Sequence, residues 1–151
     1  LYPEAPDCLA RLKGAGFRLV VVTNQPDVGN GLIPLSLAEE MNRILANRLP
    51  LDAIKVCYHG QTENCDCRKP KPTLLQAAAA QLAIALDRSF MVGDRASDVA
   101  AGRAAGCRTV FIDHGYAAEF RPTDADFSVG SLDEASRVIL SAGDVFGRKA
   151  P

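Results

Sequence analysis

The strongest constraint on the fold is a series of short apolar runs that end in polar residues. Residues 17–23 form a largely β-branched run that is followed by Asn24. Residues 89–92 form a second run, and Asp94 follows it closely. Strands that are apolar on both faces are typical of parallel sheets, which helices cover on both sides. These runs therefore predict parallel strands inside an α/β protein.

Helical segments alternate with the apolar runs along the chain. Strands are expected at 17–23, 54–58, 89–92, 108–112 and 127–129, and helices at 7–14, 36–49, 74–86, 96–105 and 132–140. Ser36 and Glu39 form a capping box, which favours a helix start at Ser36. The alternation predicts a Rossmann-like three-layer sandwich around a mostly parallel sheet. Residues 1–151 are expected to form a single domain.

Charge and hydropathy exclude two classes of partner. The net charge is −1 and the pI is near 6.1, whereas a nucleic-acid binder usually has a basic face and a high pI. No apolar run approaches the ~18–20 residues that a membrane span needs. We therefore expect no nucleic acid and no membrane among the partners, and we expect a small-molecule ligand instead.

The cysteines divide into two groups. Cys8 and Cys107 lie in apolar stretches and are expected to be inert core thiols. The others crowd around a histidine within residues 57–67, and the cluster consists of Cys57, His59, Cys65 and Cys67. Three thiolates and one imidazole fit a closed, structural zinc site in a reducing compartment. The alternative is a set of free thiols beside a surface histidine.

Three further features together suit a phosphoryl group. Thr23 and Asn24 offer a hydroxyl, an amide and backbone N–H groups at the end of a strand. Residues 68–72 place three cations among two prolines. Asp94 and Asp98 supply carboxylates, which are ligands that Mg²⁺ prefers. Each feature alone also has an ordinary explanation, as a helix cap or a solvated turn, but together they form an electrostatic clamp for phosphate.

The same segments resemble the haloacid dehalogenase (HAD) superfamily. The resemblance is carried by Val-Val-Thr-Asn-Gln at 21–25, Cys-Asp-Cys-Arg-Lys-Pro-Lys-Pro at 65–72 and Met-Val-Gly-Asp-Arg at 91–95 with Asp98. More narrowly, the motifs and the Cys/His cluster resemble the capless branch of heptose-bisphosphate and histidinol-phosphate phosphatases. The resemblance implies Mg²⁺-dependent hydrolysis of a phosphomonoester through a phosphoaspartyl intermediate, in the cytoplasm.

The resemblance also implies roles for individual residues. Thr23 would bind the transferring phosphate by its hydroxyl, and Lys69 would stabilise the phosphate charge and the nucleophile. Asp94 would hold Mg²⁺, and Asp98 would orient the metal shell. The substrate contacts would come from Asn24, Gln25, Arg68 and Arg95. The loop 26–34 would help to choose the substrate, and Asn30 stands there in place of the branch's usual arginine.

The family's nucleophile motif, Asp-x-Asp-Gly on the first strand, does not occur in these residues. Asp124 and Asp126 form the only Asp-x-Asp, and we expect both to be solvated loop acids. The domain is therefore expected to be N-terminally incomplete, without its first strand. The resemblance implies that this strand is central, between the strands at 17–23 and 89–92, so that its absence leaves two unpaired strand edges facing each other. The chain alone is expected to be inactive and poorly stable. The alternative is a natural pseudoenzyme.

The main functional hypothesis is a phosphatase whose substrate is a small phosphorylated metabolite, with a heptose bisphosphate favoured. The alternatives are an inactive relative that binds phosphate or a partner, and a histidinol-phosphate phosphatase domain. His114 is expected to be a turn residue rather than a general base. The oligomeric state stays open.

Overall fold

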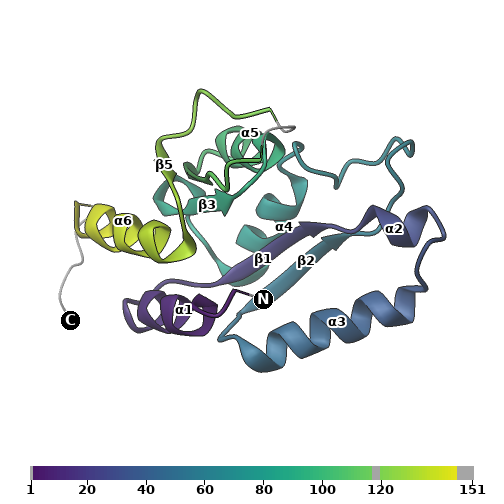
Figure 1. Cartoon of the computed structure of the whole chain (residues 1–151), viewed down its shortest axis with the longest axis horizontal. Coiled ribbons are helices and arrows are strands. Elements are labelled where there is room, and N and C mark those ends of the chain that lie inside the picture. Colours follow the sequence, from purple (N-terminus) through teal and green to yellow (C-terminus); the bar gives the residue numbers. More distant parts are fainter. Residues whose placement is uncertain (1, 117–119, 146–151) are drawn as a thin grey trace.

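The computed structural model describes residues 2–116 and 120–145 as an α/β protein (Figure 1). The elements follow in the order α1 (Ala5–Gly14), β1 (Val20–Asn24), α2 (Pro26–Gly29), α3 (Leu35–Arg48), β2 (Ala53–Cys57), α4 (Thr73–Leu82), η1 (Leu86–Arg88), β3 (Phe90–Gly93), α5 (Ala96–Ala104), β4 (Arg108–Ile112), β5 (Phe127–Val129) and α6 (Leu132–Val145). Every strand and helix expected from the sequence is present. In the part of the chain that the structure describes, no helix is long and apolar enough to cross a membrane.

The sheet is parallel, as predicted, and it consists of two separate halves, as expected for a sheet without its central strand. β1 pairs with β2, so that Val20 lies opposite Ala53. β3, β4 and β5 form the second half in that order, all of them parallel. Among the described residues, no strand pairing joins β1 to β3. The α/β class is therefore confirmed, with a division of the sheet between these two strands.

Helices cover both faces and complete the predicted three layers. On one face, Leu12 of α1 and Ile139 of α6 pack with Val110 of β4 in the larger apolar core. On the other face, Leu75 of α4 packs with Ala101 of α5 and with residues of β3. Burying a side chain such as Val110 fully contributes about 2 kcal/mol, so these two cores hold the helices against the divided sheet.

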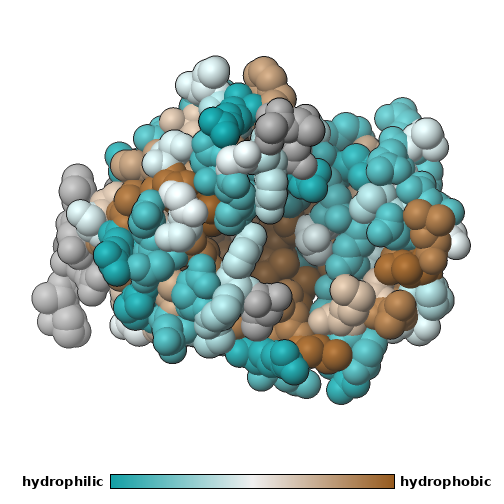
Figure 2. All heavy atoms as spheres, in the orientation of Figure 1, coloured by the Kyte–Doolittle hydropathy of each residue, from teal (hydrophilic) through white to brown (hydrophobic). Residues whose placement is uncertain are grey.

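A cleft of about 980 Å³ lies between the two halves of the sheet. Its walls include residues 20–22 of β1 and residues 90–94 at β3, and apolar residues of α1 and α6 close its side. Figure 2 shows apolar atoms recessed near the middle of the visible face, between hydrophilic neighbours. The cleft therefore combines an apolar lining with strand edges on two opposite sides.

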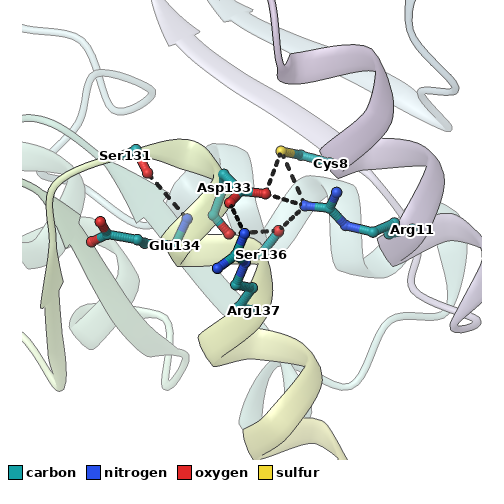
Figure 3. A network of polar contacts seen from close by, with 7 residues as sticks. All are labelled: Cys8, Arg11, Ser131, Asp133, Glu134, Ser136 and Arg137. Atoms are coloured by element: carbon teal, nitrogen blue, oxygen red, sulfur yellow. Dashed lines mark hydrogen bonds and ion pairs between the residues drawn. The ribbon is translucent and has the colours of Figure 1, made fainter.

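A polar network joins α1 to α6 beside the cleft (Figure 3). The Arg11 guanidinium forms an ion pair with Asp133 and donates to Ser136 Oγ at 2.8 Å. The hydrogen bond from Arg11 lowers the pKa of Asp133. The sulfur of Cys8 lies 3.5 Å from the same guanidinium nitrogen, and Cys8 is fully buried. Burial confirms the expectation of a core thiol for Cys8 and also for Cys107, whose pKa it raises to about 11.

Several expected helix bounds differ from the structure, and α6 runs to Val145 rather than ending at residue 140. α3 begins at Leu35 after an extended Pro34, which places Ser36 inside the first turn, so its hydroxyl forms no cap. α4 ends at Leu82 rather than at residue 86, because Ala83 adopts a left-handed conformation with φ 52°. The Ile84 amide then donates to the Ala79 carbonyl, which closes the helix.

Asp126 is exposed, as expected, but its carboxylate also binds a buried residue. Its carboxylate accepts hydrogen bonds from the Thr109 amide at 2.7 Å and from the Thr109 hydroxyl at 2.8 Å. Thr109 is fully buried, so Asp126 satisfies polar groups that water does not reach. Asp124 is exposed and forms an ion pair with Arg103.

Candidate phosphate site and metal centre

The end of β1 is joined to the loop before α4 by an amide side chain. Asn24 Nδ2 donates to the Lys69 carbonyl at 3.2 Å, and the Lys69 amide donates to Asn24 Oδ1 at 3.1 Å. Thr23 lies one residue earlier, and its side chain forms no hydrogen bond within the described residues. The strand thus leaves a hydroxyl available for a ligand beside a fixed lysine backbone.

The Lys69 side chain connects the two halves of the sheet. Its ammonium donates to the Val22 carbonyl at 2.7 Å and lies 2.7 Å from Asp98 Oδ1. The two charged side chains are only 11% and 7% exposed, so water screens their attraction poorly. Lys69 therefore places a buried positive charge between the edge of β1 and the start of α5.

The end of β3 supplies the carboxylates. Asp98 lies in the first turn of α5, and its Oδ2 accepts a hydrogen bond from the Arg95 amide at 3.2 Å. A Cβ at Gly93 would lie 2.2 Å from that same carboxylate oxygen, so glycine is required there for Asp98 to approach. Asp94 forms no hydrogen bond or ion pair within residues 2–116 and 120–145. A carboxylate without a partner at a strand end fits a hard cation such as Mg²⁺.

The Cys/His cluster forms a compact ligand set next to this site. The ligand atoms of Cys57, His59, Cys65 and Cys67 all lie within 4.8 Å of one another. The Cys57 and Cys65 sulfurs are 3.7 Å apart, and His59 Nδ1 lies 3.2 Å from the Cys67 sulfur. A tetrahedron with Zn–S bonds of ~2.3 Å places two sulfurs about 3.8 Å apart, so the geometry fits zinc.

Two side chains that were predicted to contact the substrate form hydrogen bonds with other residues of the protein. The Arg68 guanidinium donates to the carbonyls of His59 and Gly60, the latter at 2.8 Å, and so ties the Cys/His loop together. Gln25 Nε2 donates to Oδ1 of Asn42, a residue of α3, at 3.2 Å. Their proposed contacts with substrate remain predictions, as does that of Arg95.

The sequence interpretation missed three partners of Lys69. Asn24 was expected to contact the substrate and Asp98 to orient the metal shell, and neither these side chains nor the Val22 carbonyl was considered as a partner of Lys69. His114 lines the cleft, and its ring stacks on Tyr2, whose hydroxyl lies 2.9 Å from Nε2. Its assignment as a turn residue stays a prediction.

Comparison with known proteins places these features in a family. Residues 66–135 match the HAD-hydrolase-like family model. The chain is 40% identical over 102 residues to the D-glycero-β-D-manno-heptose-1,7-bisphosphate 7-phosphatase of Helicobacter pylori, covering 64% of this chain and 59% of that protein. The enzyme of the same name from Pseudomonas putida is 36% identical over 118 residues, covering 75% and 67%.

Solved structures agree with the sequence relatives. A D,D-heptose 1,7-bisphosphate phosphatase from B. bronchiseptica, complexed with magnesium and phosphate, superimposes with a TM-score of 0.75 at 27% identity, covering 93% of this chain and 84% of the other. A putative HAD-like phosphatase from Mesorhizobium loti gives a TM-score of 0.78 at 27% identity, covering 100% and 77%. The match spans 59% of the length of the Helicobacter relative. The chain belongs to the HAD superfamily, in the branch that contains the heptose-bisphosphate phosphatases.

Proposed function

We propose that this chain carries the phosphate- and metal-binding part of a Mg²⁺-dependent phosphomonoester hydrolase. The single observation that carries the proposal is the position of Lys69, whose ammonium lies between the end of β1 and Asp98. Among the described residues, the Thr23 hydroxyl and the Asp94 carboxylate have no hydrogen-bond or ion-pair partner. Together with the Lys69 ammonium they make a set suited to phosphoryl transfer, which depends on positioning and charge neutralisation.

Each residue has a separate task in this proposal. The Thr23 hydroxyl and the backbone amide of Asn24 donate to the phosphate oxygens, since the next amide, that of Gln25, donates to the Cys57 carbonyl at 2.8 Å. Lys69 neutralises part of their charge, at a buried position where the interaction is strong. Asp94 holds Mg²⁺ and Asp98 orients it, while Asp98 also holds Lys69 in place. When bound, the cation supplies further neutralisation of the phosphate oxygens.

The substrate proposed is a small sugar bisphosphate of the heptose class. Relatives that share 36–40% of their aligned residues with this chain are phosphatases of heptose 1,7-bisphosphate. The loop between β1 and α3, which contains α2, borders the Cys/His loop closely, since a Cβ at Gly29 would lie 2.1 Å from the Gly60 nitrogen. These two loops are therefore proposed to recognise the sugar.

We place the nucleophile on an extended strand that occupies the central cleft. The cleft lies between two strand edges and has an apolar lining, which suits a strand buried on both faces. A strand there, parallel to β1, would end at the same edge as Thr23 and Lys69. An aspartate at its end would attack phosphorus, the ester oxygen would leave with a proton, and water would then hydrolyse the acyl phosphate.

Zinc has a structural role in this proposal. Four protein ligands leave no open position for a substrate, and the loop that they organise leads directly to Lys69. Cysteines that form no disulfide, as is the case for all five here, are typical of a reducing compartment, which supports a cytoplasmic enzyme.

Peptide complementation tests the proposal directly. The chain is mixed with a peptide of five β-branched apolar residues followed by Asp-x-Asp-Gly, in Mg²⁺, and phosphate release from heptose 1,7-bisphosphate is measured. Turnover is expected with this peptide and not with a control in which the first aspartate is asparagine. Peptide binding without turnover, together with intact phosphate binding, would instead favour the noncatalytic phosphate-binding function.

A further inference from the structure

The Asn24 carboxamide makes an unusually complete contact with one residue of the neighbouring loop. Its nitrogen donates to the Lys69 carbonyl at 3.2 Å, and its oxygen accepts from the Lys69 amide at 3.1 Å. Both polar groups of this single side chain thus bind the backbone of a single partner. The two residues are separated by 45 positions in the sequence, so the contact is a tertiary link between β1 and the loop before α4.

The backbone of Lys69 is shaped for such a contact. Lys69 lies in a turn in which the Lys71 amide donates to the Arg68 carbonyl at 2.9 Å, and the proline after Lys69 disfavours a helical backbone at this residue. In this turn the N–H and the C=O of Lys69 both face the side chain of Asn24. A carboxamide offers a donor and an acceptor side by side, so it pairs with both groups as a neighbouring strand would.

We propose that Asn24 is a positioning residue for Lys69, and that its side chain fixes the lysine rather than binding the substrate. The proposal rests on Lys69 being the phosphate-binding cation. Two hydrogen bonds to the Lys69 backbone set where the side chain starts, and the Val22 carbonyl and Asp98 receive the ammonium at the other end. The lysine is therefore held at both ends before any ligand binds, which lowers the entropy lost on binding phosphate.

The chemistry of the contact makes asparagine specific at this position. Aspartate keeps the acceptor for the Lys69 amide but has no donor for the Lys69 carbonyl. Leucine has a similar shape and neither group. The donors that remain for phosphate at this strand end are the Thr23 hydroxyl and the backbone amide of Asn24, which the side chain of Asn24 does not supply.

Amide hydrogen exchange at Lys69 and phosphate affinity separate positioning from direct binding. The full chain is compared with Asn24→Leu and Asn24→Asp, and Asn47→Leu on the exposed face of α3 serves as the matched control. Exchange is followed by NMR, and inorganic phosphate is titrated in Mg²⁺ by ³¹P NMR. Thermal unfolding of each variant reports on overall stability.

In Asn24→Leu, we expect the Lys69 amide to exchange about 10-fold faster and phosphate affinity to fall about 10-fold, as the loss of hydrogen bonds worth ~1.4 kcal/mol implies. Asn24→Asp keeps one of the two bonds and should show a smaller change in exchange. If Asn24→Leu fails to fold, Asn24→Ala, which also removes both hydrogen bonds, takes its place in the two measurements. The control should match the parent chain in both measurements.

Weaker phosphate binding in Asn24→Leu with unchanged exchange at Lys69 would overturn the proposal, because the side chain would then bind the anion directly. If Asn24→Leu changed neither the exchange rate of the Lys69 amide nor the phosphate affinity, the proposal would be overturned as well. If the parent chain itself does not bind phosphate, the proposed function fails, whereas the exchange rates still test the positioning of Lys69.

Discussion

The two halves of the sheet hold their site residues by different means. In the β1–β2 half, every residue of β1 is half-buried, and the site depends on polar contacts such as Asn24 with Lys69. In the β3–β5 half, four of the five residues of β4 are buried. There the site residue Asp98 itself lies within a packed helix–strand contact, beside Gly93.

This difference indicates where the site depends on ligands for its order. Apolar packing is present whether or not a cation is bound, so the carboxylate half should keep its shape alone. The lysine half depends on hydrogen bonds and on the Cys/His loop, so its order should follow metal content. The comparison therefore predicts unequal responses of the two halves to the same perturbation.

The largest effect is expected from removing the loop metal. Structural zinc contributes on the order of 10 kcal/mol to the folding of small zinc domains, so chelation or Cys65→Ser should disorder residues 58–69. NMR should show loss of the Lys69 signals and of phosphate binding, while the amides of β4 keep their protection from exchange. Cys107→Ser, outside the cluster, should keep its metal. Equal loss of protection in both halves would contradict the comparison.

The next largest effect comes from the same substitution made in each half. Ile112→Ala removes a buried side chain from the larger core and should lower the free energy of unfolding by about 3 kcal/mol. Ile54→Ala, at a half-buried position of β2, should cost about 1 kcal/mol. Urea denaturation of both variants measures the difference. Similar losses would mean that the two halves are packed equally well.

A smaller, pH-dependent effect is expected at Asp52. The hydrogen bond from Lys13 and that from the Leu19 amide lower the pKa of this carboxyl to about 2. A lowered pKa stabilises the folded state above the unfolded value near 3.8, and the contribution disappears as the pH falls through about 2. Asp52→Asn should therefore cost about 2 kcal/mol at pH 7.

The pH series supplies the control for Asp52. Unfolding of the parent chain and of Asp52→Asn is measured between neutral pH and pH 2, and the two stabilities should converge at the acid end. A constant difference across this range would mean that the carboxylate charge is not what joins α1 and β1 to the start of β2.

The smallest effect is expected at the joint between α1 and α6. Arg11 and Asp133 are 45% and 31% exposed, so water and salt screen their attraction. Arg11→Met should lower the thermal midpoint slightly, and added salt should reduce the difference from the parent chain. If Arg11→Met destabilised the protein as much as Ile112→Ala does, this polar network, rather than apolar packing, would hold the two halves together.

Much of this architecture could be predicted from the sequence, because strand and helix order depends on local periodicity. Thr23 and Asp94 were predicted at strand ends for the same reason. The left-handed conformation of Ala83 was not predicted, because nothing in the sequence marks a non-glycine residue that adopts it. The contact of Asn24 with Lys69 was missed because it joins residues far apart in the chain, and only the fold brings them together.

The central claim, that both halves contribute to one phosphate and Mg²⁺ site, is tested most directly by phosphate titration with and without Mg²⁺. In the parent chain, Mg²⁺ should raise phosphate affinity about 10-fold, a shift of ~1.4 kcal/mol. Asp94→Asn should abolish this enhancement, and Lys69→Gln should weaken binding under both conditions. A Mg²⁺ enhancement that survives in Asp94→Asn, or phosphate affinity unchanged in Lys69→Gln, would contradict the claim.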